Sequence, residues 1–180
     1  MENDDELIHR LRSDETKEAA FKELLKLYKE RLYWHIRHIV KSHDDADDVL
    51  QNTFIKIYNN IHSFKGESKL FSWMYRIATN EAITHLNQTA KRMNITSEAL
   101  QQQTIDQLQA DVYFEGSAIQ LKLQQAIATL PEKQQLVFNM KYFQELKYRD
   151  MSEILNTSEG ALKASYHIAT KKIEEYLTGN

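Results

Sequence analysis

"KLFSWMYRIATNEAITHLNQTAKR", residues 69–92, is the stretch that decides the fold class of this sequence. On a helix that turns about 100° per residue, its apolar residues gather on one side: Leu70, Phe71, Met74, Ile77, Ala78 and Ala82. A second stripe, spaced three or four residues apart, holds a large ring, a guanidinium and small polar groups: Trp73, Arg76, Asn80, Thr84 and Asn87. The pattern predicts a long helix with one buried side and one polar side.

The same rhythm of apolar residues continues on the N-terminal side. It runs through residues 17–40 and again through "HDDADDVLQNTFIKIYNNI" at 43–61, where Asp44 or Asp45 is expected to cap the helix. The whole chain holds only four Gly and one Pro, so few positions interrupt helices. We therefore expect an all-α protein.

Residues 93–118 break this rhythm. The segment contains "EALQQQTIDQLQAD" and Gly116, and it has no Lys or Arg. A loop of this length is uncommon inside one compact domain. We therefore predict two small helical domains, residues 1–92 and 119–180, joined by a flexible linker over residues 93–118 that lets them bind separate patches of one large partner.

The second domain ends in two helices with a short break between them. "KYRDMSEIL" is followed by Asn156 and Thr157, and then by "SEGALKASYHIATKKIEEYL", whose first residue, Ser158, suits a helix cap. Asn156 suits the turn because Asn tolerates a left-handed backbone. The core between the helices is expected from Met151, Ile154, Leu155, Leu162 and Tyr166. The pattern is typical of a helix-turn-helix that reads DNA, although an ordinary helical hairpin shares it.

The charge distribution restricts what the chain can bind. A net charge of −3 and a pI near 6.2 argue against a general binder of polyanions. Residues 69–92, however, hold four basic residues and one acid, so nucleic-acid binding is expected to be local or assisted by a partner. The polar stripe suits base edges, phosphates and unstacked bases. Alternatively, Trp73 lies at the edge of the core and Arg76 pairs with a carboxylate.

No recognisable catalytic or metal motif is present. The acids of "DDADD" at 44–48 lack the alternation and the glycine of a calcium loop, and His35 and His38 have no third ligand at a suitable spacing. The sequence has no Cys, no membrane-length apolar run and no signal-like start, which suits a soluble cytoplasmic protein. We expect no cofactor, no metal and no enzymatic activity.

One face of the helix expected at residues 43–61 suits a protein partner. Asp47, Asp48 and Gln51 lie near one another on it and favour a basic surface, and Phe54 is expected to be its apolar anchor. Asp44 and Asp45 are explained more simply, because acids are favourable at a helix N-terminus.

Two blocks of the sequence together resemble the bacterial sigma factors of the extracytoplasmic-function (ECF) type, in the sigma-70 family. "DADDVLQNTFIKIYNNIHSFKGESKLFSWMYRIATNEAITHL" is similar to their region 2, and "LPEKQQLVFNMKYFQELKYRDMSEILNTSEGALKASYHIATKKIEEYL" is similar to their region 4. The resemblance covers roughly residues 15–92 and 119–178, in the family's order. It implies a two-domain subunit that binds core RNA polymerase and directs transcription initiation at specific promoters.

The resemblance also implies where each partner binds. Region 2 would bind the clamp helices of the polymerase through Asp47, Asp48, Gln51 and Phe54. It would read the −10 element and hold it open with Lys65, Ser68, Lys69, Trp73, Arg76, Asn80, Thr84, Asn87, Lys91 and Arg92. Region 4 would bind the polymerase flap with its first helices and read the −35 element with Ser158, Glu159, Gly160, Lys163, Ala164, Ser165, His167 and Lys171.

The implied partners are core RNA polymerase and promoter DNA, both duplex and single-stranded, with an anti-sigma factor as a further candidate, no membrane insertion and a monomeric free chain. The run "LKASYHIATKKI" departs from the family, in which Arg is usual there. Lys163, Ala164 and Ser165 instead favour a different base preference or a weaker hold on phosphate. Two alternatives stay open: a stand-alone helix-turn-helix regulator that does not depend on polymerase, and a helical scaffold in which both stripes are buried.

Overall fold

Every element that the structure describes is a helix, which confirms the all-α prediction. The computed structural model describes residues 2–106 and 118–179, and none of these residues lies in a β-strand. Within them, no helix is long and apolar enough to cross a membrane. In chain order the elements are α1 (Glu2–Arg12), α2 (Lys17–Val40), α3 (His43–Asn60), the short 3-10 helix η1 (Ile61–Ser63), α4 (Leu70–Met93), α5 (Ser97–Asp106), α6 (Ala118–Ala128), α7 (Glu132–Tyr142), α8 (Tyr148–Leu155) and α9 (Glu159–Thr178).

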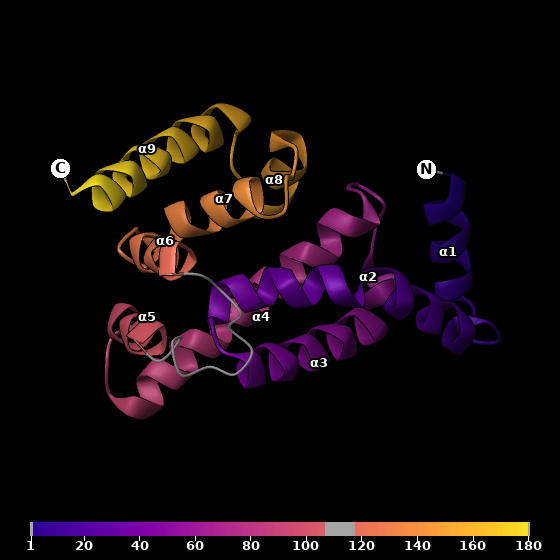
Figure 1. The fold of residues 1–180 in the computed structure, drawn as a ribbon. Helices are drawn as coiled ribbons and strands as arrows, with labels where there is room; N and C mark the ends of the chain where they lie inside the picture. Colours follow the sequence, from indigo (N-terminus) through magenta and orange to yellow (C-terminus); the bar gives the residue numbers. More distant parts are fainter. Residues whose placement is uncertain (1, 107–117, 180) are drawn as a thin grey trace.

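Helices α2, α3 and α4 pack against one another and form most of the first half (Figure 1). The start of α3 differs from the prediction, because Ser42 caps it instead of Asp44 or Asp45. The Ser42 hydroxyl accepts a hydrogen bond from the backbone N–H of Asp45 at 3.4 Å. Lys41, the residue that follows α2, adopts a left-handed conformation (φ 64°). Ser42 is extended and occupies the N-cap position of α3, so Asp44 and Asp45 lie in the first turn of that helix.

Helix α4 buries more of its surface than its sequence pattern predicts. Leu70, Met74, Ala78 and Ala82 are buried as expected, and Phe71 and Ile77 are half-buried. Ser72, Tyr75 and Thr79 are buried as well, because α2 and α8 cover α4 on two sides. A helix that is covered on two sides needs a wider buried face than one apolar stripe provides.

The linker expected over residues 93–118 is partly helical. Helix α5 occupies residues 97–106, and Leu100 is buried in the same apolar cluster as α2 and α4. Ten residues of the predicted linker thus form a helix that packs on the first half. Residues 107–117 lie outside the described part of the chain.

The predicted helix-turn-helix is formed by α8 and α9. Asn156 adopts the left-handed conformation (φ 49°) between them, as predicted. The Ser158 hydroxyl caps α9 by accepting a hydrogen bond from the backbone N–H of Ala161 at 3.3 Å. The core expected between the two helices is confirmed, with Met151, Ile154 and Leu162 buried and Leu155 and Tyr166 partly buried.

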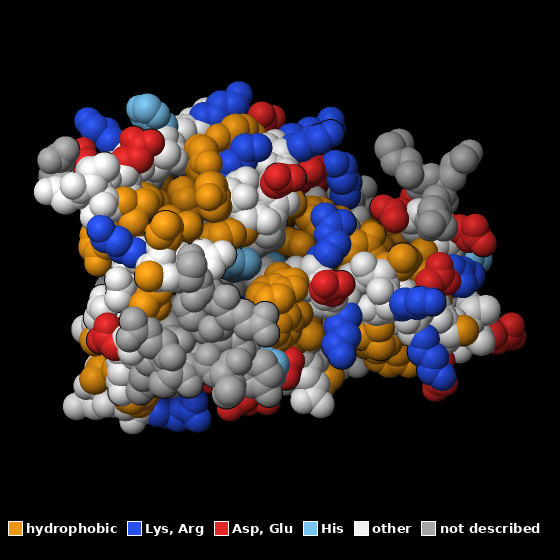
Figure 2. Space-filling view, viewed as in Figure 1, with side chains coloured by type: hydrophobic (Ala, Val, Ile, Leu, Met, Phe, Trp, Pro, Cys, Tyr) orange, Lys and Arg blue, Asp and Glu red, His pale blue; other side chains and the backbone are white. Residues whose placement is uncertain are grey.

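The two halves of the chain pack against each other along a contact that we call the seam, formed by α2 and α4 on one side and α6, α7 and α8 on the other. Helix α8 lies against α4, and α7 lies against α2 (Figure 1). Apolar residues of α7, including Leu136, Val137 and Met140, belong to the same core cluster as the first half. In Figure 2, hydrophobic side chains also gather on the visible surface over α6, α7 and α9. The two halves, which correspond to the two predicted domains, are therefore in contact.

Candidate nucleic-acid interface

The loop before α4 has the sharp geometry that its glycine predicts. Gly66 adopts a φ of 77°, a conformation that residues with a Cβ rarely adopt. Around it, Lys65 is exposed, Ser68 is partly exposed, and the Lys69 ammonium forms a 2.5 Å ion pair with Asp150 of α8. The loop thus presents donors suited to phosphate, but one of them is engaged with the second half.

The polar stripe of α4 faces outward as predicted. Arg76, Asn80, Thr84 and Asn87 are exposed, and Trp73 is half-buried with its ring centroid 5.3 Å from that of Phe64. The Arg76 guanidinium donates a hydrogen bond to the backbone carbonyl of Glu153 in α8. The partner of Arg76 is thus a carbonyl group, instead of the carboxylate that the alternative reading of the stripe required.

A cavity of about 760 Å³ separates part of this stripe from the helix-turn-helix. Arg76 and Asn80 line it from α4, while Ala161 and Ser165 line it from the first turns of α9. The structure therefore brings residues predicted to read two different promoter elements to one groove that is open to solvent. Thr157 and Ala161, which the sequence reasoning did not select, share this wall.

The outward face of α9 carries most of the residues predicted to read the −35 element. Exposed positions are Ser158, Glu159, Gly160, Lys163, Ala164, His167 and Lys171, whereas Ser165 is partly covered. Leu162, Ala169 and Ile173 face inward and fix the orientation of the helix. The Lys163 ammonium lies 5.6 Å from the ring centroid of Tyr148, which holds it beside the N-terminal half of the helix.

The face of α3 predicted to bind polymerase is only partly as expected. Asp47, Asp48 and Gln51 are exposed, but Phe54 is buried, with 7% of its surface exposed and its ring packed edge-on against Phe21. Phe54 therefore does not project from the helix, and its role as the apolar anchor for polymerase stays a prediction. It forms the floor of an apolar groove of about 330 Å³, lined by Phe21, Leu25, Gln51, Phe54, Ile55, Tyr58 and Asn59. Ile55, which is half exposed, is the apolar side chain that the sequence reasoning missed.

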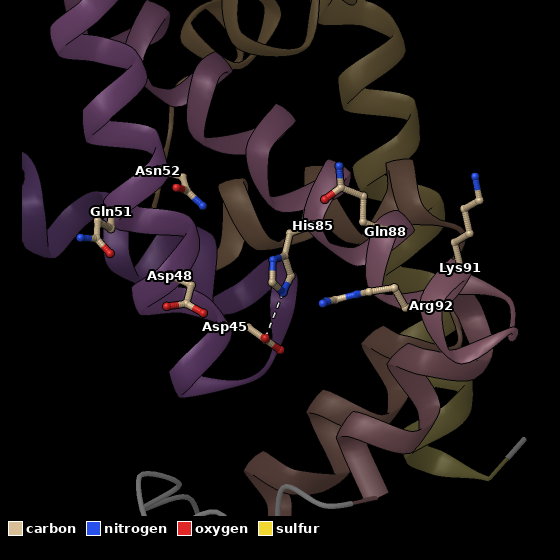
Figure 3. A pocket seen from close by; sticks show the side chains of 8 residues that line it. All are labelled: Asp45, Asp48, Gln51, Asn52, His85, Gln88, Lys91 and Arg92. Atoms are coloured by element: carbon tan, nitrogen blue, oxygen red, sulfur yellow. Dashed lines mark hydrogen bonds and ion pairs between the residues drawn. The ribbon is translucent and has the colours of Figure 1, made fainter.

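A second, polar groove of about 820 Å³ lies between the start of α3 and the end of α4 (Figure 3). Its lining residues are Asp45, Asp48, Gln51, Asn52, His85, Gln88, Lys91 and Arg92. His85 bonds to Asp45 at 2.9 Å, and the Arg92 guanidinium points back toward this pair while Lys91 points away. The predicted polymerase face and the basic end of α4 therefore share one groove. Asn52, His85 and Gln88 were missed, although Asn52 lies four residues from Asp48 and Gln88 lies three or four residues from Thr84, Lys91 and Arg92.

Three basic side chains of α2 and its cap are desolvated at the seam. Burial is the main cause that lowers the pKa of His35 to about 3, that of His38 to about 4 and that of Lys41 to about 7. His35 lies between Thr79 of α4, at 2.8 Å, and Gln144, at 3.0 Å. These contacts give His35 a structural role. Among the described residues, no cluster of His, Cys, Asp or Glu is arranged to hold a metal ion.

Comparison with known proteins gives a consistent result across the chain. The profile of Sigma-70 region 2 matches residues 24–92, and that of Sigma-70, region 4 matches residues 120–173. The chain is 31% identical to the ECF RNA polymerase sigma factor SigW of Bacillus subtilis, over 88% of the chain and 89% of that protein. It is 27% identical to the RNA polymerase sigma-H factor of Pseudomonas aeruginosa, over 98% and 95%. Its fold matches the solved structure of CnrH in complex with the cytosolic domain of CnrY, with a TM-score of 0.70, 18% identity and 98% of both chains covered.

Proposed function

This chain belongs to the ECF group of the sigma-70 family of RNA polymerase sigma factors, and from that membership we propose how its helices divide the work of promoter recognition. As a sigma factor it directs RNA polymerase to initiate transcription at specific promoters. The polymerase carries out the chemistry of RNA synthesis, so we assign this chain no catalytic step. Its contribution is binding, which we divide among α4, α9 and α3.

The α4 stripe and the loop before it would hold the opened −10 element. The observation that carries this proposal is the exposed row of Arg76, Asn80 and Thr84 beside the half-buried Trp73 ring. An unpaired base offers a ring face for stacking, which contributes about 1–3 kcal/mol per base, and offers base edges to Asn and Arg. A surface that binds only the separated strand shifts the equilibrium toward open DNA by its differential affinity.

Helix α9 would enter the major groove of the −35 element. Its exposed N-terminal face carries small side chains at Gly160 and Ala164, which permit a close approach to base edges. Lys163 and Lys171 would contact phosphates, where cations set affinity more than sequence preference. Helices α6 and α7 would bind the polymerase flap.

The exposed face of α3 would bind the clamp helices of the polymerase. Asp47, Asp48 and Gln51 supply polar contacts, and Ile55 with the groove beside it supplies apolar area. We also extend to this chain an anti-sigma factor as a partner, because solved structures with the same fold include CnrH with CnrY and RpoE with the anti-sigma factor NepR from Bartonella quintana.

The test is reconstitution with sigma-free bacterial core polymerase on a promoter mapped by sequencing run-off transcripts from genomic DNA. Asn80→Ala with Thr84→Ala should leave binding to polymerase unchanged and lower strand opening at the −10 element at least tenfold, measured with a fluorescent base. Asp48→Arg should instead abolish co-migration with polymerase in gel filtration. Full opening by the α4 double variant would contradict the proposed role of the stripe.

A further inference from the structure

The seam engages residues that the proposed function needs free. Lys69 is paired with Asp150, and Arg76 donates to the Glu153 carbonyl, so α8 engages two side chains of the face assigned to the −10 element. The −10 and −35 elements are, by their names, about 25 base pairs apart, or about 85 Å of duplex at 3.4 Å per pair. Helices α4 and α8 are in direct contact. The closed arrangement therefore cannot read both elements at once, an argument that rests on the proposed function.

Polar groups on the second half are incompletely satisfied when the seam is closed. Asn139 Oδ1, Gln144 Oε1 and Glu153 Oε2 are buried and make no hydrogen bond. Each would regain a partner from water if the halves separated. Apolar contacts of α7 favour closure, and these unpaired atoms oppose it. Such a balance suits an interface that opens and closes reversibly.

Two basic groups of α2 and its cap also lie at the seam: His38 is partly buried and Lys41 is buried. The His38 ring stacks on Phe143 at 4.5 Å, and its backbone carbonyl accepts a hydrogen bond from Asn139 at 3.2 Å. The Lys41 ammonium is buried and donates to Gln124 of α6 at 3.1 Å.

Among the residues that the structure describes, the charged groups that shift the pKa values of His38 and Lys41 are cations. Arg37 on α2 adds a further cation that disfavours charge on His38 and Lys41. The second half contributes uncharged partners: Gln124, Asn139, Phe143 and Gln144. From α4, Tyr75 and Thr79 face His35. Closure therefore favours the neutral forms of His38 and Lys41.

We propose that the seam is a proton-coupled latch, which holds Lys69 and Arg76 against α8 when His38 and Lys41 are unprotonated and opens when they take up protons. Closure would keep these two side chains of the −10 face engaged in the free chain, and protonation would release them. The coupling is a property of the chain itself and needs neither polymerase nor DNA.

The direction of the pH effect follows from the lowered pKa values. The closed form holds His38 at a pKa of about 4 and Lys41 at about 7, below their usual 6.5 and 10.5. Opening therefore takes up protons between pH 4 and 6.5 and again between pH 7 and 10.5, so acid favours the open form. A histidine that regains its ordinary pKa on opening lowers the closed-to-open ratio about tenfold between pH 7.5 and pH 5.5.

The test is single-molecule energy transfer between dyes on the two halves of the full chain. The sequence contains no cysteine, so Asn59→Cys on α3 and Glu174→Cys on α9, both exposed, provide specific attachment sites. Wild type should show a short-distance population at pH 8.5 and a growing long-distance population at pH 7.5 and pH 5.5. Far-UV circular dichroism at each pH separates opening from unfolding.

Matched variants assign the protons. His38→Gln should remove most of the response between pH 7.5 and 5.5, and Lys41→Met should remove the response between pH 8.5 and 7.5. The exposed residues His9 and Lys26 provide the controls His9→Gln and Lys26→Met, which should keep the wild-type response. Asp150→Asn, which only breaks the ion pair to the loop, should raise the open fraction at every pH.

A single distance at all pH values, or an unchanged response in both seam variants, would overturn the latch. Because the measurement uses neither promoter nor polymerase, that failure would leave the proposed function standing. Loss of strand opening in the reconstituted system is, conversely, independent of any pH response.

Discussion

Phe54 and Ile55 are neighbours on α3, and their different burial predicts a folding role for the first and a binding role for the second. Phe54 is 7% exposed and packs edge-on against Phe21 at 6.1 Å, whereas Ile55 is 50% exposed. Replacing a buried Phe by Ala costs about 3–5 kcal/mol. Because the vacated space borders an open groove that water can enter, we expect the lower end, about 3 kcal/mol. Ile55→Ala should change stability by less than about 0.5 kcal/mol.

The assay is urea unfolding followed by far-UV circular dichroism, paired with gel filtration against core polymerase. At an m-value of about 2 kcal/mol per molar urea, Phe54→Ala should lower the unfolding midpoint by about 1.5 M. Ile55→Ala should keep the wild-type midpoint and bind polymerase about tenfold more weakly, the loss expected of a moderate interface contact. An unchanged midpoint for Phe54→Ala, or lost stability for Ile55→Ala, would refute the assignment of the two residues.

Three further changes test other parts of the structure. Ser158→Ala removes the hydroxyl that accepts from Ala161 and should cost about 1 kcal/mol in urea unfolding; unchanged stability would contradict its capping role. Lys163→Ala should weaken binding of the holoenzyme to −35 DNA at all sequences and reduce the salt slope by about one; a change confined to one base position would indicate base readout instead. The pKa of Lys41 is lowered to about 7 in the folded chain, so between pH 7 and pH 9 the folded chain binds fewer protons than the unfolded chain. The free energy of unfolding should therefore rise over this range by at most about 1.4 kcal/mol per pH unit. Wild type and Lys26→Met should show this rise in urea unfolding, and Lys41→Met should not.

Features that depend on local spacing could be predicted from the sequence. The outward position of Asn80 and Thr84, the left-handed Asn156 and the Ser158 cap each follow from residues within one or two helical turns. The resemblance to sigma factors likewise rests on contiguous blocks. The family was therefore predictable, because local residue spacing and contiguous sequence blocks can both be recognised without knowledge of tertiary contacts.

Features that depend on distant pairs could not be predicted in this way. Lys69 and Asp150 are 81 residues apart, and each alone reads as an ordinary surface charge. The sequence spacing of Phe54 is the same whether its side chain is exposed or buried. Its burial depends on packing against another helix, where Phe21 lies against it. The burial of Lys41 is still less predictable, because Lys is almost never buried and its sequence context gives no partner.

Charge and geometry together indicate where the free energy to open the seam must come from. The chain has a net charge of −3, and two of the four cations in residues 69–92, Lys69 and Arg76, are engaged by α8 in the closed form. DNA alone therefore gains little by competing for this face, since phosphate contacts dominate non-specific affinity. The face of α3 proposed to bind polymerase lies on the side of α2 and α4 away from α7 and α8 (Figure 1), so we expect docking there neither to require nor to drive separation. We therefore expect opening to be driven by partners of the second half or by the proposed protonation of His38 and Lys41, because a ligand shifts an equilibrium only through different affinities for its two states.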